Sequence, residues 1–405
     1  MKKRVLIIGG GASGLTAAVM AARNGAAVTI LEQNERVGKK ICATGNGKCN
    51  LTNLRMPADA YRGTHPEFAK PALEQFSVQD TIRFFSELGI YTVNKNDGYL
   101  YPHSGQASSV ADVLRMEACS LGVKLKTKEK AVSLKQSQAE GKEAQIWQIR
   151  TQTWDYEADA VILAGGSRAS QISGSDGSCY DLAKSLGHPV VEPLPALTAL
   201  KCKGKNSSSA FSAWSGVRTG GKVTLCLDGI PMKSEIGELQ LTDYGISGIP
   251  VFQLSRYAIR ALYENCPVSL LVDFLPEFTK EGLAAFLETR RKNCPYKSQK
   301  ELLVGLFPDK LAKVLLKEAD LVQAIKAYPL TVTAGLSFAQ AQVCSGGVDT
   351  KSVDADTMES RLHPGLYFAG ELLDIDGTCG GYNLQWAWSS GACAGRHAAG
   401  KETFL

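Results

Sequence analysis

A glycine-rich turn near the start of the chain has the residue types and the spacing that hold a dinucleotide. The apolar run 5–8 ends in Gly9-Gly10-Gly11-Ala12-Ser13-Gly14, and a second apolar run, 26–31, ends on Glu32. In a GxGxxG turn the first glycine allows the tight bend, the second lets the backbone approach a pyrophosphate, and the third lets helix and strand pack. Glu32 follows at about the 20-residue spacing at which a carboxylate binds a ribose. We therefore predict a strand–helix–strand unit whose helix N-terminus faces an anion.

Two further strand ends carry glycines and can join the first. One apolar run ends in Ala164-Gly165-Gly166, and another ends in Gly370-Glu371 before a glycine-rich turn at 377–381. Ligands bind at the carboxyl ends of the strands in a doubly wound parallel sheet, so the three turns can converge on one extended ligand. A nicotinamide dehydrogenase commonly needs only the first turn, whereas FAD is longer. We predict an α/β fold with a Rossmann-like FAD-binding domain that has three layers, a parallel central sheet and a β-meander.

The third glycine turn opens a helix whose position matters for redox chemistry. Gly380-Gly381-Tyr382-Asn383 begins a helical stretch that runs to about His397. A reduced flavin develops negative charge at N1 and O2, and the amides of a helix N-terminus stabilise such charge. This turn therefore favours a flavin over a nicotinamide cofactor.

The remaining chain predicts the elements that position these turns. Hydrophobic periodicity indicates helices and strands, a Ser/Gly-rich loop and an inserted β domain followed by a helical segment. The helices are expected at 67–75, 78–88 and 107–121, the strands of the meander at 131–135, 145–150 and 153–156, the β domain at 201–273 with its loop at 204–221, and the helical segment at 278–328.

Composition excludes several other classes of protein. The 405 residues are 44% hydrophobic and 21% charged, with a formal charge of only +5, which predicts two or three globular domains and no nucleic-acid or membrane partner. The basic N-terminus is followed by only four apolar residues, too few for a signal peptide. Eleven cysteines show neither a CxxC pair nor a zinc spacing, so we expect reduced thiols, no metal site and a cytoplasmic location.

Several motifs together resemble one family, the NAD(P)/FAD-dependent oxidoreductases that include aminoacetone oxidase and the flavoprotein of bacterial bile-acid dehydroxylation. The resemblance covers nearly the whole chain. The motifs that carry it are Gly9–Gly14 with Glu32, Gly38–Ile41 with Thr44–Asn50, Tyr101–Ser104, Thr242–Gly248, Cys344–Val348, and Phe368–Glu371 with Gly380–Asn383.

The resemblance implies a β-barrel and a small helical domain inserted into the FAD-binding domain. The expected FAD-binding domain is 1–190 with 346–405, the barrel 191–276 with about 331–345, and the helical domain 277–330. The residues it places around FAD are Gly9, Gly11, Ala12, Ser13, Gly14, Glu32, Gln33, Lys40, Thr44, Gly45, Gly47, Cys49, Asn50, Val132, Ala164, Gly165, Gly166, Gly370, Glu371, Gly380, Gly381, Tyr382 and Asn383.

Candidates for chemistry beyond the flavin are fewer. Tyr101, His103, Asp243 and Tyr244 are candidate proton donors for hydride addition to a polarised double bond, although each has an alternative structural role. Cys42 and Cys49 follow the second core strand, where disulfide reductases carry a redox pair, but six residues separate them, so packed or flavin-flanking thiols are the alternative.

These features predict an FAD-dependent oxidoreductase in which NAD(P)H, bound transiently, drives hydride transfer through flavin to an organic acceptor such as a conjugated enone. No second GxGxxG turn is present for a nicotinamide cofactor. An FAD-dependent oxidase of a small amine or amino ketone, a non-catalytic flavin redox sensor and a nicotinamide dehydrogenase remain as alternatives. The small-molecule substrate and the oligomeric state stay open at this point.

Overall fold

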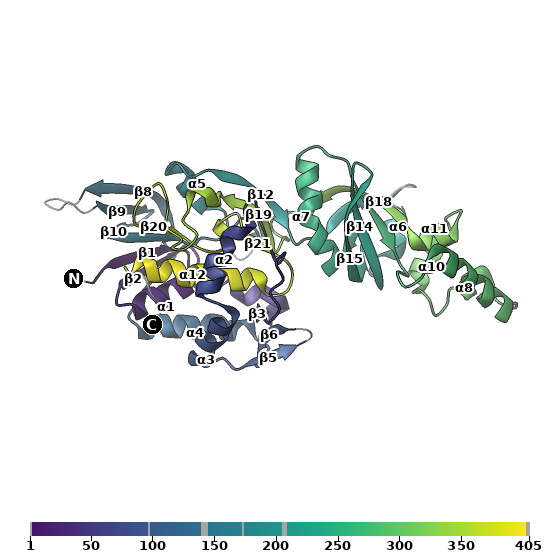
Figure 1. Ribbon diagram of the computed structural model, residues 1–405, viewed down its shortest axis with the longest axis horizontal. Helices are drawn as coiled ribbons and strands as arrows, with labels where there is room; N and C mark the ends of the chain where they lie inside the picture. Colours follow the sequence, from purple (N-terminus) through teal and green to yellow (C-terminus); the bar gives the residue numbers. More distant parts are fainter. Residues whose placement is uncertain (1, 96–97, 139–144, 172–173, 205–208, 402–405) are drawn as a thin grey trace. The chain divides into compact units, whose positions relative to one another are not determined.

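The chain forms two compact units. The computed structural model describes residues 2–95, 98–138, 145–171, 174–204 and 209–401 (Figure 1). The first unit comprises Met1–Pro193 with Val343–Leu405, and the second comprises Leu194–Gln342. The second unit is therefore an insertion between two parts of the first.

A five-stranded parallel sheet forms the centre of the first unit. Its three central strands are largely apolar and buried, as parallel strands covered by other layers must be, whereas the edge strand Lys124–Thr127 is polar and mostly exposed. In the order β20-β11-β1-β2-β7 they are Leu366–Phe368, Ala160–Leu163, Arg4–Ile8, Ala27–Glu32 and Lys124–Thr127. The predicted Rossmann-like sheet is confirmed.

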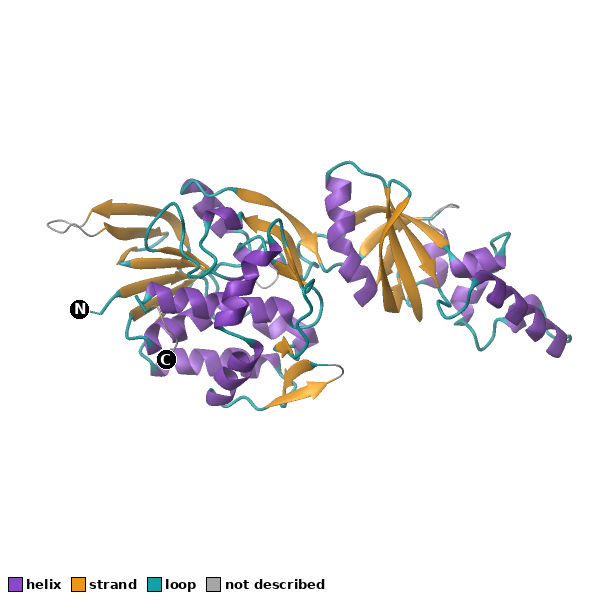
Figure 2. Cartoon of the chain, in the orientation of Figure 1, coloured by secondary structure: helices purple, strands orange, loops and turns teal. Residues whose placement is uncertain are grey.

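Helices and a β-meander complete the three layers of the first unit (Figure 2). The three-stranded antiparallel meander is confirmed close to the predicted positions. The predicted helix 67–75 is instead split, because its first turn is a 3-10 helix that begins at Pro66. The elements are α1 Ala12–Arg23, α3 Val78–Glu87, α4 Ala107–Ser120, α5 Ser178–Ser185, α12 Tyr382–Ala398, the split pair η2 Pro66–Phe68 and α2 Ala69–Gln75, and the meander strands β8 Ala131–Gln138, β9 Gln145–Thr151 and β10 Asp155–Ala158.

Two glycines let α12 lie directly against α1 (Figure 1). A Cβ added at Gly391 would lie 2.4 Å from the carbonyl oxygen of Ser13, and one added at Gly395 would lie 2.3 Å from that of Ala17. Real Cβ atoms do not approach a backbone oxygen so closely. The helix crossing therefore depends on the absence of both side chains.

Small strand pairs extend the first unit near the glycine turns. β3 Thr52–Asn53 and β5 Thr92–Lys95 flank β6 Tyr99–Pro102 in one antiparallel sheet. β4 Tyr61–Arg62 pairs with β21 Asp376–Gly377, which lies just before α12. A two-stranded sheet joins β12 Val190–Ala196 and β19 Val343–Val348 where the chain passes between the units.

The second unit is a closed six-stranded antiparallel barrel with helices, which confirms the predicted inserted barrel, and helices are found within the stretch 278–328 that was predicted to be helical. Within the predicted loop 204–221, residues 205–208 lie outside the described residues, and the loop prediction is wrong for α6 Ser209–Trp214. That segment is helical because Phe211 and Trp214 are buried in the core of the unit. The strands, in barrel order, are β13 Leu200–Lys203, β16 Gly245–Ser247, β15 Ile230–Leu241, β14 Arg218–Leu227, β17 Val268–Asp273 and β18 Tyr328–Gly335, and the helices include α7 Ile249–Tyr263, α8 Lys280–Asn293, α9 Gln299–Leu302, α10 Asp309–Leu315 and α11 Leu321–Lys326.

Among the residues that the structure describes, no helix combines the length and the apolar character needed to cross a bilayer.

A buried histidine makes the stability of the first unit depend on pH. His188 is 2% exposed, and its ring nitrogens lie 2.9 Å from Ser352 Oγ and 3.0 Å from Ser360 Oγ. Burial, with His363 nearby, lowers the pKa of His188 to about 4. An unfolded histidine titrates at about 6.5, so the unfolded chain binds a proton first and stability falls between about pH 6.5 and 4.

We expect His188→Asn to remove most of the loss of unfolding free energy that His188 causes, which is on the order of 2 kcal/mol between about pH 7.5 and 5. Urea unfolding at the two pH values measures it. His103→Gln, which changes an exposed imidazole, should keep the pH dependence of the unaltered protein. An equally steep loss of stability in His188→Asn would contradict the prediction.

Candidate functional site

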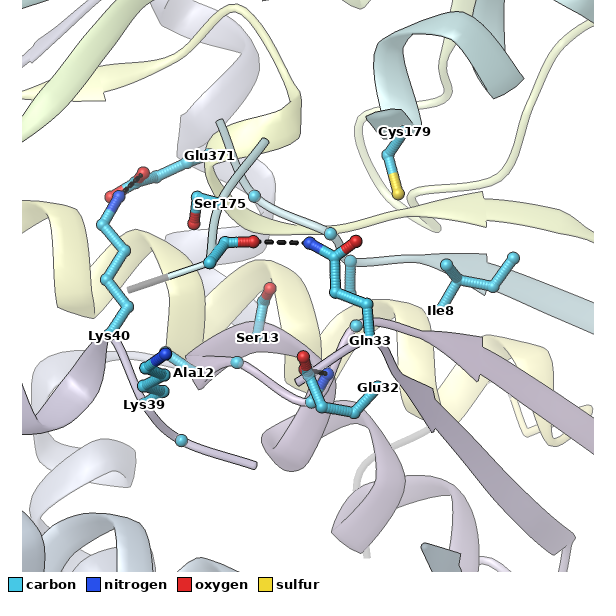
Figure 3. A pocket seen from close by; sticks show the side chains of 18 of the residues that line it. Ile8, Ala12, Ser13, Glu32, Gln33, Lys39, Lys40, Ser175, Cys179 and Glu371 are labelled. Atoms are coloured by element: carbon cyan, nitrogen blue, oxygen red, sulfur yellow. Dashed lines mark hydrogen bonds and ion pairs between the residues drawn. The ribbon is translucent and has the colours of Figure 1, made fainter. Parts of the chain in front are cut away.

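A long groove crosses the carboxyl ends of the central strands in the first unit (Figure 3). Its empty volume, counted with its open mouth, is about 1010 Å³. The turn 9–13 after β1, residues 31–33 at the end of β2, and 164–166 after β11 all line it. The first two of the three predicted glycine turns therefore meet at one groove, and Glu371 and Asn383 from the C-terminal segment line it as well.

The glycines of the first turn are required for two different reasons. A Cβ at Gly9 would lie 2.5 Å from the oxygen of Ala164, and one at Gly14 would lie 1.9 Å from the oxygen of Gly9, so packing within the protein excludes both side chains. A Cβ at Gly11 would meet nothing within 4 Å, and its φ of −81° suits any residue. Gly11 lines the groove, so its backbone is open to the close approach of a ligand.

The N-terminus of α1 opens onto the groove beside Gly11. Ala12 and Ser13 line the groove in the first turn of this helix. The first N–H groups of a helix have no partner within it and carry partial positive charge, so this end of the groove suits a phosphate.

Glu32 lies at the groove with its carboxylate already held by the neighbouring backbone. Its Oε2 accepts a hydrogen bond of 2.8 Å from the amide of Gly10, and its Oε1 accepts from the backbone and side-chain nitrogens of Asn34 at 2.8 and 2.7 Å. A carboxylate oxygen can accept more than one hydrogen bond, so Glu32 retains capacity for a ligand hydroxyl. Sequence reasoning missed the second role of Glu32, which is to shape the turn around Gly10.

Residues 174–176, which follow β11 in the chain, line the groove near the end of β2. Gln33 donates a hydrogen bond to the carbonyl of Gly174 (Figure 3). Lys130 Nζ lies 2.6 Å from Asp176 Oδ2. Burial alone would raise the pKa of Asp176, but hydrogen bonds from Lys130 and Ser178 outweigh it and hold the pKa at about 2. No pattern in the sequence identifies Lys130, Gly174 or Asp176 as groove residues.

An ion pair lies at the wall of the groove. Lys40 Nζ lies 2.6 Å from Glu371 Oε2, and Ser167 Oγ donates to the same oxygen at 3.0 Å (Figure 3). Lys39 lines the groove beside them. Residues far apart in the chain thus place both signs of charge where hydroxyl and phosphate groups of one ligand can be bound.

The helix α12 forms the other end of the groove. Asn383, Leu384 and Ala387 line it from the first turns of this helix. Asn383 Oδ1 accepts from the amide of Gly377 at 2.8 Å, and its Nδ2 donates to the carbonyl of Gly377 at 2.9 Å. The helix begins after Gly381, whose φ of 95° favours glycine and where an added Cβ would lie 2.8 Å from the backbone of Thr52.

Of the other residues expected around the ligand, Thr44 lines the groove. Val132 is 47% exposed, and its neighbour Ala131 lines the groove instead. The expected residues that are not among the lining residues are Gly45, Gly47, Cys49 and Asn50, in and after the irregular segment 41–47, and Gly370, Gly380, Gly381 and Tyr382. Asn50 Oδ1 is buried and has no hydrogen-bond partner.

The two cysteines considered as a redox pair are both free thiols. Cys49 is fully buried, and burial raises its pKa to about 12. A thiol held protonated in this way is a poor nucleophile. Cys379 is also a free thiol.

The candidate proton donors fall into different units. Tyr101 is half-buried on β6, where a Cβ at Gly45 would lie 3.7 Å from its ring, and His103 is exposed beside Tyr91. Asp243 and Tyr244 belong to the second unit, so their predicted role stays a prediction. Sequence reasoning missed Tyr99, which shares a face of β6 with Tyr101 and whose ring would lie 2.8 Å from a Cβ at Gly380.

Within the described part of the chain, no group of three or more His, Cys, Asp or Glu side chains is arranged to hold a metal ion.

Comparison with known proteins gives matches along nearly the full length. Residues 3–397 match the family model described as HI0933-like protein Rossmann domain. The chain is 46% identical to the 3-dehydro-bile acid delta(4,6)-reductase of Clostridium scindens, over 98% of this chain and 99% of the relative. It is 31% identical to the ribosomal RNA dihydrouridine synthase of Haemophilus influenzae, over 96% of this chain and 97% of the relative.

A solved structure shares the overall fold at much lower identity. The 3-ketosteroid delta1-dehydrogenase of Sterolibacterium denitrificans, in complex with 1,4-androstadiene-3,17-dione, has a TM-score of 0.50 and 12% identity, covering 98% of this chain and 99% of that one. Such a likeness shows the fold alone.

Proposed function

Since the chain belongs to the HI0933-like family of FAD-dependent Rossmann oxidoreductases, which confirms the family predicted from its motifs, we propose that it reduces a carbon–carbon double bond conjugated to a carbonyl. Hydride reaches the substrate through FAD, and the first compact unit is the FAD-binding domain.

Gly11 is the observation that carries the cofactor assignment. The polypeptide leaves room for a side chain at Gly11, yet a glycine stands there at the wall of the groove. The residues proposed to hold FAD are the α1 amides at its pyrophosphate, Glu32 at the adenosine ribose, Lys40 and Glu371 at the ribityl chain, and the start of α12 with Asn383 at the flavin pyrimidine. When bound, FAD supplies the hydride chemistry, while the protein orients it and excludes water.

The substrate class rests on a chemistry that the two relatives share. A 3-dehydro-bile acid is a 3-ketone, and a Δ4 double bond lies next to that carbonyl. Dihydrouridine is uridine whose C5–C6 double bond, conjugated to the C4 carbonyl, has been saturated. Both names thus describe hydride addition to a conjugated carbonyl compound. The higher identity to the first relative favours a steroid-type enone, and a uracil base in RNA is the second candidate.

Hydride addition to an enone also requires a proton at the neighbouring carbon, and Tyr101 is the proposed donor in the first unit. Burial raises the pKa of Tyr101, as do the neighbouring Tyr99 and Cys49. The phenol therefore stays protonated at neutral pH, as a donor must. His103, Asp243 and Tyr244 are the further candidates.

NAD(P)H is the proposed electron donor, bound transiently rather than in a second dinucleotide turn. The cytoplasm is the proposed location, because all eleven cysteines are free thiols and reducing compartments keep them so.

Anaerobic half-reactions of the purified holoprotein test this function. We expect NADH or NADPH to bleach the flavin absorbance and a 3-keto-4,6-diene steroid to restore it, with one of the steroid's two double bonds reduced for each reduced flavin that is reoxidised. The matched control is the saturated 3-ketone, which should leave the flavin reduced. A uridine-containing ribosomal RNA transcript tests the second candidate. Recovery by air alone, with neither substrate reduced, would show an oxidase instead.

A further inference from the structure

A buried ion pair lies next to the turn that opens α12. Arg62 in β4 and Asp376 in β21 face each other in the register of the two strands, and Arg62 Nη2 lies 3.2 Å from Asp376 Oδ2. The two side chains are only 7% and 2% exposed. Removing both charges from water costs several kcal/mol per ion, and the attraction between them offsets this only in part, so such a pair is weak evidence of a gain in stability.

Hydrogen bonds connect this pair to a groove residue. Arg62 Nη2 also donates to the carbonyl of Gly377 at 3.3 Å. The same carbonyl accepts from Asn383 Nδ2 at 2.9 Å, and the amide of Gly377 donates to Asn383 Oδ1 at 2.8 Å. Gly377 is thus hydrogen-bonded both to Arg62 and to Asn383 in the first turn of α12. Asn383 in turn lines the groove.

Gly63 and Thr64, which follow β4, contact the same turn at a second point. Asp374 accepts hydrogen bonds from the amide and the hydroxyl of Thr64 at 2.9 and 2.6 Å. A Cβ at Gly63 would lie 2.2 Å from the carbonyl oxygen of Asp374, so the two segments touch through their backbones. The segment 61–64 therefore determines where the turn before α12 lies.

We propose that Arg62 and Asp376 are positioning residues for the flavin site: their ion pair fixes Gly377, and through Asn383 it fixes the direction in which the first amides of α12 point. The proposal rests on the proposed function, in that those amides stabilise the negative charge of reduced flavin. Because the pair as a whole is neutral, its role is geometric rather than a contribution of net charge.

The test is the midpoint potential of bound FAD, measured by equilibration with a reference dye. In Arg62→Met/Asp376→Leu, which removes both buried charges together, we expect affinity for reduced FAD relative to oxidised FAD to fall about tenfold. For a two-electron couple this is a potential about 30 mV lower. Arg62→Lys keeps the positive charge but replaces the planar guanidinium with a single ammonium group. We therefore expect a smaller shift of the midpoint potential in the same direction.

A buried pair in the second unit gives a matched control. Lys326 Nζ lies 2.7 Å from Asp273 Oδ2, with side chains 8% and 18% exposed. Lys326→Met/Asp273→Leu should change the melting temperature without changing the flavin potential. An unchanged potential in folded Arg62→Met/Asp376→Leu and in Arg62→Lys, or an equal shift in the control, would overturn the proposal. A lowered potential in a protein that reduces no enone would support the positioning role and overturn only the proposed substrate class.

Discussion

Replacing Gly11 with alanine is expected to weaken FAD binding about 100-fold while leaving the fold intact. The added methyl group meets no protein atom within 4 Å and the backbone dihedrals suit alanine, so the apoprotein loses nothing by it. The methyl group would instead occupy the space in which the pyrophosphate approaches the turn. A 100-fold weaker dissociation constant corresponds to about 2.7 kcal/mol. Titration of the apoprotein with FAD, followed by flavin fluorescence, measures it.

Two other glycines make the Gly11 experiment selective. Gly14→Ala places a Cβ 1.9 Å from the oxygen of Gly9, so we expect loss of stability in the apoprotein as well as loss of FAD. Gly220→Ala, at an exposed glycine in the second unit that also has open space around it, should change neither property. If Gly11→Ala bound FAD as tightly as Gly220→Ala does, the assignment of the groove to FAD would be contradicted.

The parts of the fold that could be predicted are those in which local pattern and burial agree. The runs at β1, β2 and β11 are largely apolar and end in glycine or an acidic residue, which few structures other than a buried parallel strand explain. The loop prediction was wrong at α6 because the polar, glycine-rich sequence on either side of it is typical of a loop, and only two aromatic residues indicate otherwise. Phe211 and Trp214 make it a helix only once the barrel offers a core to bury them.

The candidate site could be predicted where a residue type has one dominant use at its position. Gly11, Glu32 and Glu371 belong to turns whose place at the strand ends follows from the sheet, whereas the ion pair between Lys40 and Glu371 was not predicted. Residues such as Lys130 and Asp176 carry no such signal, because an exposed lysine and aspartate are ordinary in any loop. Arg62 and Asp376 were missed for a related reason: only the pairing of β4 with β21 shows that these charges are buried together.

The crossing of α1 and α12 gives a large expected loss of stability from a single methyl group. Gly395→Ala places a Cβ 2.3 Å from the carbonyl oxygen of Ala17, and backbone cannot yield as a side chain can, so α12 must move away from α1. We expect a loss of about 3 kcal/mol or more in urea unfolding, although alanine is the better helix former by about 1 kcal/mol. In Gly282→Ala, in α8, the added Cβ would lie 3.2 Å from the hydroxyl of Thr279 and 4.0 Å from the ring of Phe278, both of them side chains, so this variant should stay within about 1 kcal/mol of the unaltered protein. Because α12 also presents its first turn to the groove, Gly395→Ala should weaken FAD binding in the fraction that remains folded, and full stability with full affinity would show that the two helices are free to separate.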